Sequence, residues 1–150
     1  MNCFNEYLYK YGLHDCKLNK MEIKNGILCL YFNQGVYELN EDGKETSLTG
    51  SCILSMQLAE ISNSLNLSEQ IDVVKISKGK KFDVEYETFE KILNKFEFDV
   101  AINYYSYFCN TIMLKGYIRS AEYEITIPMV RRVSFEFPKT RVGEVSSIEN

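Results

Sequence analysis

Residues 20–30 read KMEIKNGILCL, in which the pair Asn25-Gly26 separates two runs of alternating apolar and polar side chains. This pair tolerates the positive φ angles of a type I′ turn, which joins adjacent antiparallel strands. Folding about the turn places Ile23 opposite Leu28, with the neighbouring apolar residues on the same face and the charged ones on the other. The stretch therefore predicts a β-hairpin of defined register.

The alternation of apolar and polar side chains returns farther along the chain, after a short stretch at 87–95 whose apolar residues have helical spacing. Residues 87–95 predict a helix, with Thr88 as its N-cap, and residues 4–11 predict another that ends at Gly12. Residues 63–70 read as a polar loop and 77–81 as a cationic turn. Additional strands are expected at residues 36–39, 51–61, 71–76, 96–104, 111–118, 122–127 and 130–137.

The strand expected at 96–104 has the clearest pattern, because its apolar side chains alternate with polar or small ones throughout. This alternation predicts one buried face, with Ile102 and Tyr104 on it. Gly116, inside the following strand, is expected to mark a bend or a close approach of two backbones. Pro128 is expected to interrupt the ladder between the last two strands.

These patterns predict a mainly β (α+β) domain with about eight strands and two short helices. An antiparallel two-layer sandwich and a partly open barrel would both bury the apolar faces, and the sequence leaves the two open. The length of 150 residues predicts one globular domain at residues 1–140. Residues 141–150 lose the pattern and are expected to form a flexible tail.

Charge and cysteine content narrow the class of protein. Lys and Arg number 17 against 21 for Asp and Glu, a net charge of −4, and this acidic balance argues against nucleic-acid binding. The five cysteines are odd in number and lack Cys-x-x-Cys spacing, which favours reduced, mostly buried thiols. No apolar run is long enough to cross a bilayer, and no export signal is read at the start of the chain. A cytoplasmic protein without a membrane partner is expected.

Few residues could support catalysis. The sole histidine, His14, stands beside Asp15 and Cys16; in an extended chain His14 and Cys16 would share a face while Asp15 points away. A structural role at the start of the first strand is the favoured interpretation. Phosphate-binding, zinc-protease and serine-hydrolase signatures do not occur. The sequence therefore predicts no enzyme, no catalytic residue, no cofactor and no metal site.

Two stretches resemble small, poorly characterised bacterial proteins of the immunity type, which are encoded near polymorphic toxins. The first is Leu13-His14-Asp15-Cys16 ahead of the hairpin, and the second runs through FEKIL at 89–93, FEFDV at 96–100 and LKGY at 114–117. The resemblance implies a cytoplasmic inhibitor that binds a toxin delivered by a neighbouring cell. It implies no catalytic residues.

The expected function is that of a non-catalytic protein-binding domain, most specifically an immunity-type inhibitor of a bacterial toxin. Acidic side chains would face a basic toxin domain, because complementary charge speeds association. The candidate partner-binding residues are Asp83, Glu85, Glu87, Glu90 and Asp99. The alternative is a small-ligand-binding β domain, which would hold an enclosed apolar pocket of roughly 300–1,000 Å³. The partner, the ligand and the oligomeric state are left open.

Overall fold

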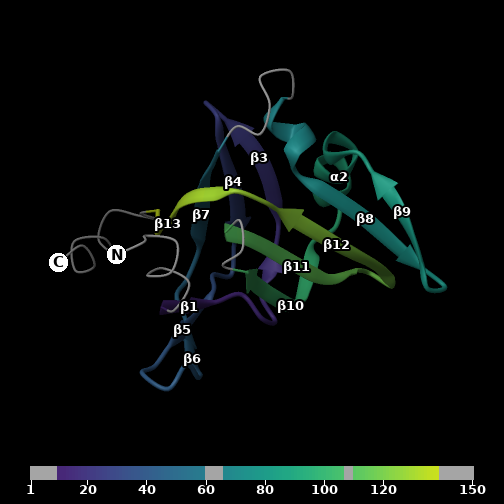
Figure 1. Cartoon of the computed structure of the whole chain (residues 1–150). Coiled ribbons are helices and arrows are strands. Elements are labelled where there is room, and N and C mark those ends of the chain that lie inside the picture. Colours follow the sequence, from purple (N-terminus) through teal and green to yellow (C-terminus); the bar gives the residue numbers. More distant parts are fainter. Residues whose placement is uncertain (1–9, 60–65, 107–109, 139–150) are drawn as a thin grey trace.

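A computed structural model describes residues 10–59, 66–106 and 110–138. Within these ranges the chain forms thirteen strands in three antiparallel sheets (Figure 1). The six-stranded sheet has the order β2 (Lys17–Leu18), β10 (Phe98–Ser106), β11 (Thr111–Ile118), β12 (Ala121–Ile127), β8 (Asp72–Ser77) and β9 (Lys80–Val84). The four-stranded sheet has the order β13 (Val130–Glu136), β7 (Cys52–Leu58), β4 (Ile27–Phe32) and β3 (Lys20–Lys24). The three-stranded sheet has the order β1 (Tyr11–Gly12), β5 (Tyr37–Leu39) and β6 (Glu45–Leu48).

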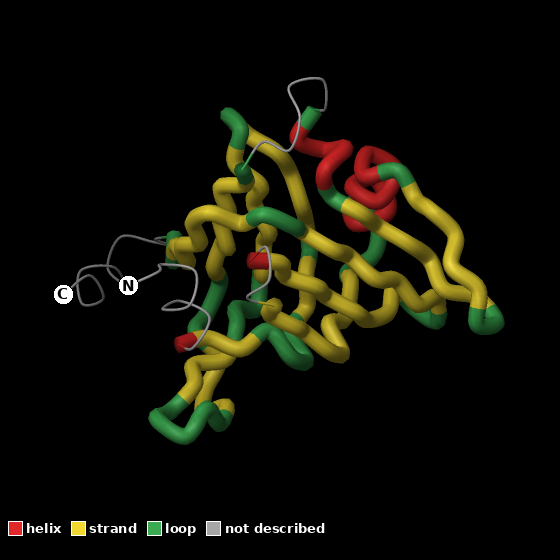
Figure 2. Tube along the Cα trace, viewed as in Figure 1, coloured by secondary structure: helices red, strands yellow, loops and turns green. Residues whose placement is uncertain are grey.

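The mainly β class is confirmed, and the strands do not close into a barrel in the described part of the chain. The 3-10 helix η1 (Leu67–Gln70) and the α-helix α2 (Tyr86–Leu93) lie together at one end of the molecule (Figure 2). The β5–β6 hairpin projects from the opposite end. This arrangement keeps the helical end and the β5–β6 hairpin well apart.

The predicted hairpin forms with its expected register. Ile23 pairs with Leu28 and Met21 with Leu30, and the turn residue Asn25 has a φ of 53°. Strand β4 then pairs with β7, so the hairpin continues into the four-stranded sheet. The turn chemistry and the apolar pattern thus act together to define this sheet.

The core is a single cluster to which the four-stranded and six-stranded sheets both contribute. Helix α2 completes it by inserting Phe89, whose ring lies 6.0 Å from that of Phe98 and 5.4 Å from that of Tyr123. Helix α2 also contacts β3 and β8, and so bridges the two larger sheets. The largest fully buried side chains are Phe32, Phe89, Phe98, Leu13, Leu18, Leu28, Leu30, Leu54, Met56, Ile112 and Leu114.

The predicted close approach at Gly116 is confirmed, and it coincides with a break in the register of β10. A Cβ atom at Gly116 would lie 1.9 Å from the carbonyl oxygen of Asp99. The register of β10 against β11 shifts between Val100 and Ile102, which is the signature of a β-bulge. The bulge reverses the alternation, so Ile102 and Tyr104 are 39% and 54% exposed instead of buried. The prediction that both face the core was therefore wrong.

Other sequence predictions need correction. The described residues form more strands than the roughly eight expected. Strands β6 and β9 lie almost wholly on the surface and carry no apolar alternation, and β1 and β2, of two residues each, are too short to show a pattern. Part of the predicted polar loop is the 3-10 helix η1. Helix α2 begins at Tyr86 with Glu85, not Thr88, as its N-cap.

Two predictions concern the ends of the chain. Most of the helix predicted at residues 4–11 lies outside the described residues, and Gly12, its expected cap, belongs to strand β1. The predicted tail at 141–150 also lies outside them. In the described residues no helix is long and apolar enough to cross a bilayer.

Candidate partner-binding surface

Three carboxylates line one pocket between η1 and the start of α2. Glu69 comes from η1, Glu85 is the N-cap of α2, and Glu87 lies in the first turn of α2. The pocket has a volume of about 330 Å³. Its other lining residues are Asn66, Ser68, Ile71, Val84 and Tyr86. We call the three glutamates and the space between them the acidic pocket.

Local backbone structure places these carboxylates. The Glu69 side chain accepts a hydrogen bond of 2.7 Å from the backbone N–H of Asn66, which holds it at the start of η1. The backbone carbonyl of Glu85 accepts the first hydrogen bond of α2, from the N–H of Phe89 at 3.0 Å. Its side chain makes no capping hydrogen bond. Glu87 lies in the first helical turn, where the helix dipole favours negative charge.

Tyr86 forms part of the wall of the acidic pocket. The residue is 4% exposed, and burial raises the pKa of its hydroxyl, with the Glu90 carboxylate as a second cause. The hydroxyl therefore stays protonated. Glu90 itself is half-buried, one turn farther along α2, and does not line the pocket.

The other two predicted partner-binding residues lie elsewhere. Asp83 precedes the pocket residue Val84 on β9, and successive strand residues point to opposite faces. Asp99, between the buried Phe98 and Val100, accepts a 2.7 Å hydrogen bond from the Lys17 ammonium group. Strands β11, β12 and β8 separate β10 from β9. The five predicted residues are therefore not one continuous cluster, and only Glu85 and Glu87 meet at the acidic pocket.

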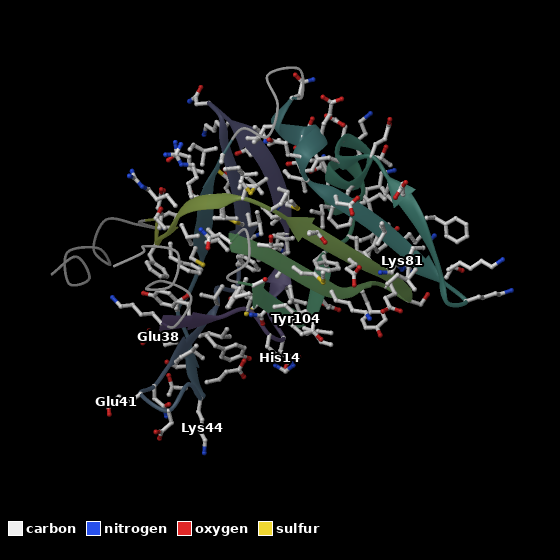
Figure 3. The ribbon with its side chains drawn as sticks, in the orientation of Figure 1. His14, Glu38, Glu41, Lys44, Lys81 and Tyr104 are labelled. Atoms are coloured by element: carbon white, nitrogen blue, oxygen red, sulfur yellow. The ribbon has the colours of Figure 1, made fainter. Side chains whose placement is uncertain are left out.

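The face of the six-stranded sheet turned away from the core, here called the outer face, carries both charge pairs and exposed apolar groups. Lys115 lies 3.5 Å from Glu122, and Lys81 lies 3.2 Å from Glu124. Ile102, Tyr104 and Tyr117 are among the exposed large hydrophobic residues. Figure 3 shows Tyr104 and Lys81 on separate parts of this sheet.

His14 and Cys16 do not share a face. Cys16 is 2% exposed and belongs to the core, whereas His14 is exposed. The expectation assumed an extended chain, but Asp15 has a φ of 65° and turns the backbone between them. Cys29 and Cys52 are likewise free and buried, as expected of reduced thiols, while Cys3 and Cys109 lie outside the described residues.

An aromatic run that begins within β10, formed by Tyr104, Tyr105, Tyr107 and Phe108, is only partly described. Tyr104 is exposed, whereas Tyr105 is half-buried and burial raises the pKa of its hydroxyl. Tyr107 and Phe108 lie outside the described residues. The two described members of this aromatic run therefore point in different directions, which does not make a shared stacking platform.

A second pocket, of about 360 Å³, lies beside the Asn25-Gly26 turn. Its lining mixes three polar side chains, Asn25, Gln57 and Gln70, with Ile27, Leu58 and Leu67. Both pockets reach the lower end of the volume range typical of small-molecule sites. Each has several polar side chains in its wall, unlike the enclosed apolar pocket expected of a ligand-binding domain.

Comparison of the chain with protein-family models, with curated proteins and with solved structures finds no match. Functional inference therefore depends on the chemistry of the surfaces described above.

Proposed function

We propose that the protein is a non-catalytic protein-binding domain of the immunity type, which inhibits a basic toxin domain in the cytoplasm. The observation that carries the proposal is the acidic pocket, where Glu69, Glu85 and Glu87 converge from two separate elements. A two-layer β scaffold would present this pocket at the helical end. No residue of the chain is assigned a catalytic role.

The acidic pocket has the chemistry to receive one basic side chain of a partner. A lysine or arginine inserted among three carboxylates would form charge-assisted hydrogen bonds, which are stronger than those between neutral groups. The pocket walls would also shield the pair partly from water, and shielding strengthens the attraction. An arginine is the better fit, because its planar fork can address two carboxylates at once.

The net charge of −4 supports a basic partner more broadly. Complementary charge accelerates the encounter of two proteins, and an inhibitor benefits from binding before its target acts. Glu90, next to the pocket on α2, would add to the local field without entering the pocket. Asp83 and Asp99 belong to the outer face and are not part of the proposed contact.

The test replaces two pocket carboxylates and compares partner capture. Immobilised full-length protein is exposed to native lysate and to co-expressed products of adjacent genes, beside the variant Glu85→Lys/Glu87→Lys. The control is Glu38→Lys/Glu41→Lys, whose residues lie on the β5–β6 hairpin (Figure 3). The proposal expects stoichiometric capture that the pocket variant loses and the control keeps. Equal capture by all three proteins, with equal melting temperatures, would refute the pocket as the binding site.

The alternative function, binding of a small ligand, draws on one feature of the same pocket. The three glutamates in its wall would accept hydrogen bonds from a cationic ligand. A thermal-shift screen with small amines and guanidinium compounds separates the two functions. A hit that depends on Glu85 and Glu87, without any captured protein, would favour the ligand.

A further inference from the structure

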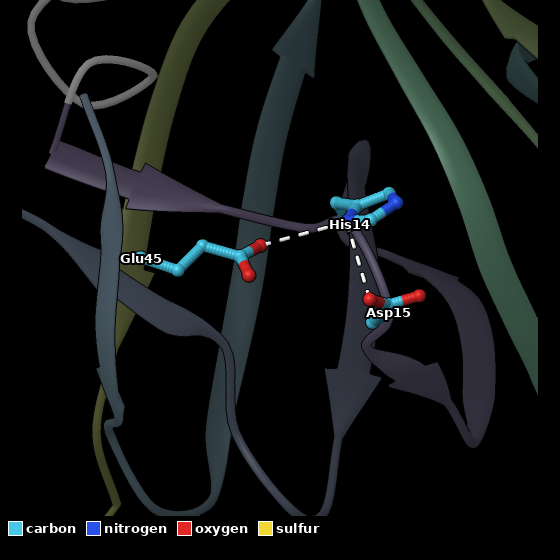
Figure 4. Close-up of side chains that lie close together, drawn as sticks. All are labelled: His14, Asp15 and Glu45. Atoms are coloured by element: carbon cyan, nitrogen blue, oxygen red, sulfur yellow. Dashed lines mark ion pairs between the residues drawn. The ribbon is translucent and has the colours of Figure 1, made fainter.

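A second group of chemically active side chains lies far from the acidic pocket, at the turn before β2. The Nδ1 atom of His14 is 3.3 Å from Oδ2 of Asp15 and 3.7 Å from Oε2 of Glu45 (Figure 4). One ligand atom from each residue lies within 4.8 Å of the other two. Imidazole nitrogen and carboxylate oxygen are both common ligands of Zn²⁺.

The fold holds two of these residues on a hydrogen-bonded turn. The N–H of Asp15 donates to the carbonyl of Val100 at 2.8 Å, and the N–H of Val100 donates to the carbonyl of Cys16 at 2.9 Å. The N–H of Cys16 closes the turn by donating to the carbonyl of Leu13 at 3.0 Å. The positive φ of Asp15 directs its carboxylate back toward the imidazole.

The third residue comes from the three-stranded sheet, which also contains β1, the strand just before the turn. Glu45 begins β6 and pairs with Leu39 of β5, so its position is set by the β5–β6 ladder. Its carboxylate approaches the same imidazole nitrogen from a different direction than the Asp15 carboxylate does (Figure 4). The group is therefore assembled by tertiary structure, because strands β2, β3, β4 and β5 lie between Asp15 and Glu45 in the sequence.

The two separations from the imidazole nitrogen fit a tetrahedral metal ion. With metal–ligand bonds of 2.0–2.1 Å, two ligands at the tetrahedral angle lie about 3.4 Å apart. The two distances from His14 Nδ1, 3.3 and 3.7 Å, are close to that value. We propose that His14, Asp15 and Glu45 form a surface site for a divalent transition-metal ion such as Zn²⁺, with water in the remaining position.

The ligand set also selects the class of metal. An imidazole ligand suits zinc and related transition ions, whereas calcium and magnesium prefer oxygen ligands alone. The side chains of His14 and Asp15 are 54% and 63% exposed, so an ion can enter from solvent without opening the fold. A bound ion would tie the turn before β2 to β6, and so would fasten the three-stranded sheet to the body of the protein.

Zinc binding is measured on the full chain without a histidine tag, with Cys3→Ser and Cys109→Ser so that these thiols do not compete. Titration calorimetry with Zn²⁺ compares this parent protein with the variants Glu45→Gln and His14→Gln. The control variant is Glu38→Gln, which replaces an exposed carboxylate on β5. Loss of a ligand should weaken binding at least about 10-fold, while the control binds as the parent does. Zinc at a hundredfold excess over its Kd should raise the parent's Tm by about 5–10 °C.

A spectroscopic readout separates a metal site from an ion pair. Because His14 is the sole histidine, its imidazole resonances can be assigned without ambiguity. Zinc binding should change the NMR chemical shift of Nδ1 and leave the proton on Nε2. Absence of any shift, together with no heat of binding at millimolar zinc, would overturn the proposal and leave His14 as an ion-pairing group. Binding that Glu45→Gln leaves unchanged would overturn it as well.

Discussion

Replacing Gly116 with alanine should destabilise the protein through a single clash. The new Cβ would lie 1.9 Å from the carbonyl oxygen of Asp99 and 2.9 Å from its carbonyl carbon. Both contacts are with backbone, so no side chain can rotate away. The β10 backbone would have to move by about an ångström to restore ordinary contact distances, which is overpacking of a tightly paired sheet.

The expected loss is about 3 kcal/mol in the free energy of unfolding, the upper end of the range for overpacked sites. For a chain of this length, that loss corresponds to a fall in Tm of about 6–12 °C. Differential scanning calorimetry measures it directly. The carbonyl of Val100 on the displaced strand accepts the hydrogen bond from the Asp15 N–H, so exchange of the Asp15 amide with deuterium should become faster.

Gly12→Ala is the matched control, because Gly12 is also a strand glycine without a positive φ. Its added Cβ would meet side chains alone, Leu39 Cδ2 at 3.1 Å and Glu45 Oε2 at 3.9 Å, and both side chains can move. The control should lose less than about 1 kcal/mol. A Gly116→Ala protein that melts within about 2 °C of the parent would refute the reasoning, since a backbone clash of this size must cost more than that.

Three more predictions follow from burial. Ile102→Ser should change the free energy of unfolding by less than about 1 kcal/mol in a urea titration. Val100→Ser, two residues earlier but in the core, should lower it by about 2–4 kcal/mol. Equal losses for the two variants would disprove the bulge. Phe89→Ala should cost about 3–5 kcal/mol by the same titration, and a near-neutral result would mean that α2 does not close the core. Burial raises the pKa of Cys16 to about 12 and that of Cys52 to about 11, from 9.0, so unfolding releases protons above pH 9. Stability should therefore fall as pH rises above about 9 toward these values, and a flat profile of Tm against pH would contradict the burial of both thiols.

Much of the fold followed from local patterns. The Asn25-Gly26 turn and its flanking residues predict both the hairpin and its register, because turn geometry and side-chain alternation are local properties. Gly116 was informative for the same reason, since a glycine inside a strand pattern signals close backbone approach. The prediction failed where one extra residue entered the ladder near Val100, because a bulge leaves the apolar pattern intact and reverses its direction.

The candidate sites were harder to predict than the fold. The acidic pocket joins Glu85 and Glu87 to Glu69, which lies in a predicted loop and is distant in sequence from the predicted partner-binding residues. Glu45 meets His14 only through the pairing of β5 with β6, and β6 carries no apolar alternation that would have predicted it. Both sites depend on tertiary contacts that residue spacing cannot report.

Strand β9 has a consequence for how copies of the protein behave at high concentration. It is the last strand of the six-stranded sheet, so one side of its backbone has no neighbouring strand in the described structure. Such an edge can pair with a strand of another chain, and here Phe82, 53% exposed, adds an apolar side chain that favours association. Lys80 and Lys81 lie on the same strand, and two copies aligned in parallel and in register would bring these ammonium groups together. The repulsion between them protects the protein against stacking into fibrils, and salt weakens that protection by screening the charges.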